Sequence, residues 1–226
     1  MASLTFLQMQ TRLNDRISGY GNLTFPDARK KYYLNDGYVE FARISHILWK
    51  QSTITIAVDD ALYAFPTATG VASVNKIWRA TWDGKVLPVK STAWMDKYIG
   101  TGWRDTKTAD IQYVLTDSED RSQIRIYPMI DLIGDITGKT FYVEYSYLPS
   151  DMSSDSDTCA LPAPYDHAPI EYAVSMCLED AVQSKQNPMM GDRALQNFWR
   201  YVGAARTEVH LGKFGDSTAH VTPPVR

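Results

Sequence analysis

The spacing of apolar residues predicts two helices at the start of the chain. The first runs from Leu4 to Ile17 and is followed by glycines that would end it. The second starts near Thr24-Phe25-Pro26-Asp27, which has the spacing of a capping box, and continues to about Lys50. Asn35-Asp36-Gly37 is typical of a turn and predicts a bend or break in this second helix. The two apolar stripes are Phe6, Met9, Leu13 and Ile17, then Leu34, Tyr38, Phe41 and Leu48.

From Ser52 onward the apolar period changes to two, which indicates strands. A first hairpin is predicted around Asp59-Asp60, and Asp83-Gly84 predicts a second. A short helix is expected around residues 93–98 within an otherwise loop-like stretch from Ser91 to Asp110. Three more strands are predicted at residues 113–115, 124–127 and 141–147. The middle of the chain therefore reads as an antiparallel β domain.

Helical spacing returns near the C-terminus. Residues 150–158 are acidic and rich in serine, which predicts a linker that ends at Leu161-Pro162-Ala163-Pro164. Two helices should follow, split at Asn187-Pro188. Their apolar stripes are Ile170, Ala173, Val174, Cys177, Ala181 and Val182, then Leu195, Phe198, Trp199, Val202 and Ala205.

This order predicts an α+β protein in which the N- and C-terminal helical pairs form a four-helix body with an antiparallel β domain inserted between them. The predicted boundaries are residues 1–50 and 165–206 for the helical body, 51–150 for the β domain and 151–164 for the linker. Residues 207–226 are predicted to be a flexible C-terminal arm, because Gly212, Gly215 and Pro223-Pro224 follow the fading of the helical pattern.

The charge argues against a protein that mainly grips phosphates. The formal net charge is −3, whereas such proteins usually have a basic excess. No apolar stretch approaches the ~20 residues that span a bilayer, and the N-terminus has no secretory pattern. Two cysteines, Cys159 and Cys177, are expected to be free thiols. We therefore expect a soluble protein that is made inside a cell and has no membrane partner.

No local motif supports a catalytic, metal or cofactor site. Gly134 to Thr140 resembles a phosphate-binding loop, but it has one residue too few and leads into a strand, so a hairpin turn is predicted. Asp151, Asp155 and Asp157 lack the Gly and Glu of a calcium loop. The histidines have no metal-ligand spacing, and no nucleophile elbow occurs. We expect no enzyme and no cofactor; an enzyme whose site is assembled from distant residues, such as a cell-wall hydrolase, is a third alternative.

The chain is rich in aromatic residues, with 14 Tyr and 6 Trp. Such side chains favour interfaces, and they also fill β cores. Trp94 and Trp103 lie in the Gly- and Thr-rich stretch, where little core is expected. With Tyr98, we predict that they contact a neighbouring subunit or a tail protein; burial in the core is the alternative.

The order of several motifs resembles the head-to-tail adaptor, or connector, proteins of tailed bacteriophages. The capped helix start leads to Leu34-Asn35 and Phe41-Ala42-Arg43, and the β segment contains a strand of the type Ile-Arg-Ile-Tyr-Pro at residues 124–128. A Tyr-rich strand then leads through Leu148-Pro149 and the acidic stretch to Leu161-Pro162-Ala163-Pro164-Tyr165, followed by two helices. The resemblance covers roughly residues 1 to 205.

This resemblance implies a structural virion protein at the head–tail junction. It implies a homo-oligomeric ring, commonly of twelve copies, that docks beneath the portal protein and presents a surface to a tail or nozzle protein. Double-stranded DNA would only pass through its channel, and the net −5 of residues 51–164 suits a lumen that does not hold DNA. We predict that the portal-docking arm begins at Thr207 and uses the separated anchors Leu211, Phe214, Val221, Pro223 and Pro224.

The second hypothesis is a nucleic-acid-binding or packaging accessory protein. Arg29, Lys30 and Lys31 would be its phosphate-contacting patch. A basic first turn is more often a solvated helix face.

Overall fold

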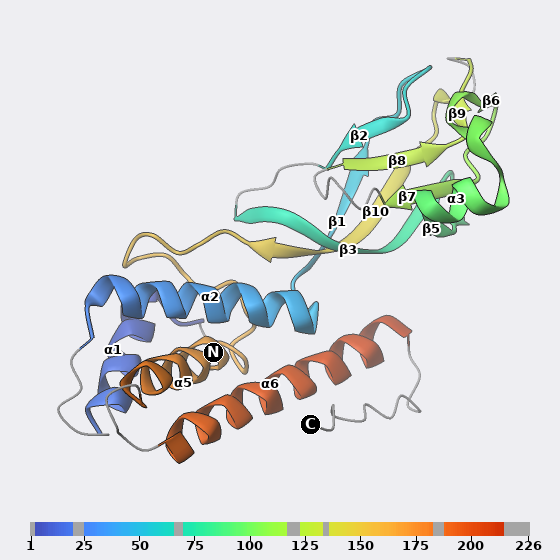
Figure 1. Ribbon diagram of the computed structural model, residues 1–226. Helices are drawn as coiled ribbons and strands as arrows, with labels where there is room; N and C mark the ends of the chain where they lie inside the picture. The colour runs from blue at the N-terminus through green and yellow to red at the C-terminus, as the bar shows by residue number, and fades with distance from the viewer. Residues whose placement is uncertain are drawn as a thin grey trace. The chain divides into compact units, whose positions relative to one another are not determined.

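A computed structural model describes residues 3–19, 25–65, 70–116, 123–132, 136–182 and 188–214. Its contacts divide the chain into two compact units (Figure 1). The helical unit consists of residues 1–48 and 149–226, and the β unit of residues 49–148. The predicted α+β class is confirmed, since each unit is built from the expected kind of element.

Helix α1 (Phe6–Ser18) follows the prediction closely. Its buried residues are Phe6, Met9, Leu13 and Ile17, the four predicted positions. A capping box starts the helix at Thr5: the Thr5 hydroxyl accepts a bond from the Gln8 backbone N–H, and the Gln8 side chain accepts one from the Thr5 N–H. The motif was expected instead at the second helix. There, Thr24 lies outside the described residues, and the N-cap is Pro26 without a side-chain bond.

Helix α2 (Asp27–Ser45) is shorter than predicted and has no break. It ends where His46 adopts a left-handed conformation, φ 58°, and Trp49 already belongs to a strand. The expected turn at residues 35–37 is wrong because each of its residues has a tertiary role. Asn35 bonds both the N–H and the C=O of Met152, each at 3.0 Å, and Asp36 accepts a 2.7 Å bond from the Tyr172 hydroxyl. A Cβ at Gly37 would lie 2.8 Å from the Tyr172 ring, so this glycine permits close helix packing.

The other helices of this unit are α5 (Ala168–Val182) and α6 (Pro188–Phe214), which pack against each other. Helix α5 also packs against α1 and α2, and α6 against α2 (Figure 1). Residues Phe198, Val202 and Ala205 of α6 are buried as predicted, whereas Trp199 is 43% exposed. Helix α6 continues to Phe214, so the first eight residues of the predicted flexible arm, 207–214, are helical. The helical pattern fades there because these last turns are largely exposed and need no apolar stripe.

The predicted linker is instead packed into the helical unit. Thr158 forms a β-bridge with Thr5, and the Cys159 N–H donates to the Leu4 C=O at 2.9 Å. The apolar residues Met152, Cys159 and Leu161 are buried. The acidic residues are used locally, since Asp157 caps two backbone N–H groups and Asp155 pairs with Lys31. The linker prediction was wrong because contacts with the distant N-terminus leave no periodic signal in this segment.

The β unit holds a first sheet in the order β1 (Trp49–Ile54), β10 (Phe141–Pro149), β3 (Val71–Trp82) and β4 (Lys85–Leu87). A second sheet has the order β2 (Leu62–Ala64), β8 (Gln123–Tyr127), β7 (Tyr113–Thr116) and β5 (Val89–Ser91). Strands β6 (Lys107–Thr108) and β9 (Met129–Ile130) form a third. The core contains Trp82, Ile111, Phe141, Val143 and Tyr145.

The hairpin predicted at Asp83-Gly84 is confirmed. Strands β3 and β4 pair antiparallel, and both turn residues have positive φ, 48° and 77°. The hairpin predicted at Asp59-Asp60 is wrong, because β1 pairs with β10 and β2 with β8, in different sheets. The β unit is also not wholly antiparallel, since β5 pairs parallel to β7 and β6 parallel to β9. Gly134 lies outside the described residues. Gly138 has φ 76° in a turn that leads into strand β10, not into a helix. The predicted hairpin is wrong, because β9 and β10 belong to different sheets.

Candidate interaction surfaces

The stretch from Ser91 to Asp110 contains helix α3 (Thr92–Tyr98) and the short helix η1 (Thr101–Asp105). The Ser91 hydroxyl caps α3 by accepting a bond from the Trp94 N–H. Met95 and Trp103 are buried with Leu115 and Tyr127 in a compact cluster. The stretch therefore has a core of its own, although its sequence shows little core pattern.

The predicted interface role of Trp103 requires a position at the surface, but this side chain is buried. It is only 3% exposed, and its ring packs edge-on against Tyr127 with centroids 5.9 Å apart. Its indole N–H donates a 2.8 Å bond to Asp96. The alternative reading, a core residue, is the correct one. A single buried Trp between polar neighbours gives no periodic signal, and this explains why the sequence placed it at the surface.

Trp94 and Tyr98 lie together on α3, where Trp94 is half-buried against the cluster and Tyr98 is exposed. They are four residues apart on the helix, their ring centroids lie 5.1 Å apart, and Tyr98 is 62% exposed. The next residue, Ile99, is 41% exposed. Lys90 lies over the Trp94 ring at 4.7 Å and Lys97 over the Tyr98 ring at 5.1 Å. We call these residues, Lys90, Trp94, Lys97, Tyr98 and Ile99, the α3 patch.

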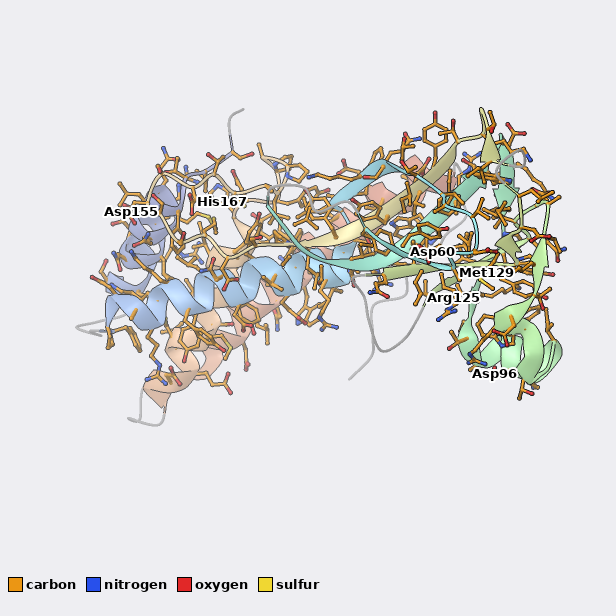
Figure 2. All side chains as sticks on the ribbon, turned by 90° about the horizontal axis from the view of Figure 1, so that it is seen from above. Asp60, Asp96, Arg125, Met129, Asp155 and His167 are labelled. Atoms are coloured by element: carbon orange, nitrogen blue, oxygen red, sulfur yellow. The ribbon has the colours of Figure 1, made fainter. Side chains whose placement is uncertain are left out.

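Asp96, which is labelled in Figure 2, holds α3 against η1 through its hydrogen bonds. Besides the bond from Trp103, its carboxylate accepts a 2.9 Å bond from the Arg104 guanidinium. Arg104 and Trp103, in that order, hold the pKa of Asp96 below its usual value. Because these groups join the helix to the buried cluster, the α3 patch is presented on a fixed support. The two lysines of the patch were missed at the sequence level, although the four-residue spacing of Trp94 and Tyr98 was a usable signal.

The residues predicted as arm anchors belong to the other unit. Leu211 lies on α6 and is 49% exposed, and Phe214 is the last residue of that helix. Val221, Pro223 and Pro224 lie outside the described residues.

Within the described residues there is little that could carry chemistry. No group of three His, Cys, Asp or Glu side chains could hold a metal ion. Burial raises the pKa of both Cys159 and Cys177 to about 12, so neither thiol is poised as a nucleophile at neutral pH. No described helix is long and apolar enough to cross a membrane.

Comparison with protein families gives a match over nearly the whole chain. A family model described as SU10 adaptor protein matches residues 4–222, which include nearly all of both units. No curated protein matches the chain.

Proposed function

Because the chain belongs to the SU10 adaptor protein family, a family of phage head–tail adaptors, we propose that it forms a ring below the portal of a tailed phage virion, extends the DNA channel and docks tail components. The observation that carries this proposal is the length of the family match, which spans the helical unit and the β unit together. An adaptor in the virion associates with portal and tail proteins and has a structural rather than a catalytic role. A ring of twelve copies is the expected form.

We assign the α3 patch to a contact with a neighbouring subunit or with a tail or nozzle protein. Tyr98 and Ile99 expose apolar surface on a helix that Asp96 holds in place. Aromatic side chains beside cations are frequent at the centres of protein interfaces. Trp103 supports the patch from beneath and would not itself touch a partner.

We assign the portal contact to the end of α6 and the residues after it, with Leu211, Phe214, Val221, Pro223 and Pro224 as anchors. Leu211 supports this assignment, because it is an exposed apolar residue that lies beyond the buried part of α6. Glu208 accepts a 2.6 Å bond from the Tyr165 hydroxyl, so residues up to that turn also serve the fold of the subunit. Truncation after Phe214 is therefore a cleaner test of the arm than truncation after Arg206.

The ring can be tested by native mass measurement and negative-stain imaging of the full chain with portal-bearing heads. We expect rings bound at the portal vertex. Absence of any binding to these heads would overturn the adaptor assignment. The chain truncated after Phe214 should keep its melting temperature and bind the portal more weakly, because it lacks Val221, Pro223 and Pro224. Undiminished binding would refute the part of the arm beyond α6, and Leu211→Ala in the full chain tests the anchor on the helix. Tyr98→Ala should leave portal binding intact and impair ring closure or tail attachment.

Phosphate binding by the α2 start has less support than the sequence suggested. Arg29 pairs with Asp180 at 2.9 Å, Lys30 with Asp27 at 2.7 Å, and Lys31 with Asp155 at 3.4 Å. All three cations are thus engaged within the helical unit. The proposal that DNA only passes through the channel predicts no retarded band in a gel-shift assay at moderate salt.

A further inference from the structure

The two lysines of the α3 patch have no carboxylate partner within the described part of the subunit. Lys90 and Lys97 lie over aromatic rings, and neither forms an ion pair with a described residue. Asp96, the carboxylate next to Lys97 in the chain, already pairs with Arg104 at 2.9 Å. The patch therefore presents two positive charges beside its exposed apolar side chains. A surface that fits it must supply negative charge together with apolar contact.

The β unit also carries a surface of the opposite charge. The Asp59 N–H donates to the C=O of Ile130 at 3.0 Å, which brings the loop before β2 beside the end of β9. Asp59, Asp60 and Asp131 are all exposed there. Lys107 lies 2.7 Å from Asp59, and Asp59, followed by Asp131, raises the pKa of this lysine above its usual value. Three carboxylates and one lysine leave two negative charges.

Apolar side chains lie next to these acids, as they do next to the two lysines. Leu132 follows Asp131 and is 62% exposed. Leu62, whose N–H donates to the Asp60 carboxylate at 3.1 Å, is 38% exposed. Asp60 and Asp96 lie apart in Figure 2, so the acids and the α3 patch occupy separate places on the β unit. We call the first group, Asp59, Asp60, Leu62, Asp131 and Leu132, the acidic patch.

We propose that the α3 patch of one copy binds the acidic patch of the next copy in the ring. The proposal rests on the ring of the proposed function, and it chooses the neighbouring subunit over a tail protein. In a closed ring, each contact joins two different surfaces of the same chain, so every copy must carry both surfaces and they must be complementary. The two patches meet this requirement in charge and in exposed apolar area.

Charge reversal tests this contact on portal-bearing heads that lack tails. Lys90→Glu with Lys97→Glu makes the α3 patch acidic, and Asp60→Lys with Asp131→Lys makes the acidic patch basic. Each pair alone should raise the protein concentration needed for complete rings at least about tenfold, because like charges then face each other. The chain with all four substitutions should again form rings like the unmodified chain. Failure of this rescue in a folded protein would overturn the proposal.

A matched control separates the patch from the net charge of the β unit. Lys76→Glu with Arg79→Glu makes the same change of charge at two exposed positions of β3 and should form rings normally. An equal loss in this control would overturn the proposal. Complete rings of the α3-patch variant that no longer bind tails would identify a tail protein as the occupant and would also overturn it. Failure of the unmodified chain to bind heads would instead overturn the adaptor function.

Cross-linking of the unmodified chain gives a second measurement that does not depend on the folding of a variant. A carbodiimide joins a lysine to a carboxylate that touches it. In rings built from isotopically light and heavy chains, we expect Lys90 or Lys97 of one chain to be joined to acids of the acidic patch of another. If these lysines are joined only to acids of their own chain, or only to another protein, the proposal is wrong.

Discussion

The cations of α1 and α2 in the helical unit and the lysines of the α3 patch in the β unit are used differently. The contrast is local, because the β unit also has ion pairs, such as Lys107 with Asp59, and the helical unit also has a lysine over a ring, Lys31 over Phe6. In the helical unit, cations are neutralised within the subunit: Arg16 lies 2.9 Å from Glu171, and Arg29 lies 2.9 Å from Asp180. In the β unit, the lysines of the α3 patch lie over aromatic rings, and the carboxylate nearest in sequence, Asp96, is held by Arg104.

This difference separates charges that build the fold from charges that remain available. Surface ion pairs contribute little stability individually, about 0–1 kcal/mol, but they orient helices and remove free charge from that surface. A lysine over an aromatic ring keeps its full positive charge, because the ring carries no net charge, and this charge can attract a partner. The comparison therefore assigns internal cohesion to the polar residues of the helical unit and partner contact to those around α3.

The prediction with the largest expected effect tests whether a buried core supports the α3 patch. Trp103→Ala should destabilise the β unit by about 3–5 kcal/mol, because a buried aromatic leaves a cavity. Chemical denaturation with exchange measurements on residues 49–148 would detect it. Tyr98→Ala is the control and should change the free energy of unfolding by less than about 0.5 kcal/mol. Equal losses of unfolding free energy in Trp103→Ala and Tyr98→Ala would show that the α3 patch is not distinct from the core beneath it.

A second prediction concerns close packing in the helical unit. Gly37→Ala should destabilise the protein by about 1–3 kcal/mol, because the new methyl group would overlap the Tyr172 side chain. Gly203→Ala is the matched control on α6, where a Cβ would meet nothing within 4 Å. It should stabilise the protein by up to about 1 kcal/mol through helix propensity. Thermal unfolding distinguishes the two; a loss in both variants would mean that helix packing at Gly37 is not the cause.

A variant of Asn35 tests the hydrogen bonds that hold the predicted linker, residues 151–164, in the helical unit. Asn35→Ala removes both side-chain bonds to the backbone of Met152 and should cost about 1–3 kcal/mol, since buried backbone groups lose their partner. Exchange should increase at residues 150–160. Gln10→Ala removes an exposed bond to Asp155 in the same segment and should have almost no effect. An unchanged exchange pattern in the Asn35 variant would mean that the segment is held by its other contacts.

The last prediction is a pH dependence at Tyr165, which changes stability only at alkaline pH. Burial, and next the bond to Glu208, raise the pKa of this phenol to about 12 from 10.0. A raised folded-state pKa contributes stability that is complete below pH 10 and is lost as pH rises through 12. The stability advantage of the unmodified chain over Tyr165→Phe should therefore shrink between pH 9 and pH 12 in denaturant titrations. A constant difference would show that the phenol does not ionise differently in the folded state.

The sequence by itself determined the elements that depend on neighbours in the chain. Four apolar positions at helical spacing predicted the buried face of α1, and Asp83-Gly84 predicted the β3–β4 turn, because both signals act within a few residues. The spacing of Trp94 and Tyr98 likewise placed an aromatic pair on one side of α3.

Only the tertiary structure decided which segments meet. It kept residues 35–37 helical through contacts with Met152 and Tyr172, and it separated β1 and β2 into different sheets. It also buried Trp103. These outcomes depend on partners that lie many residues away, and their bonds and packing outweigh local preferences of about 1 kcal/mol per residue or less.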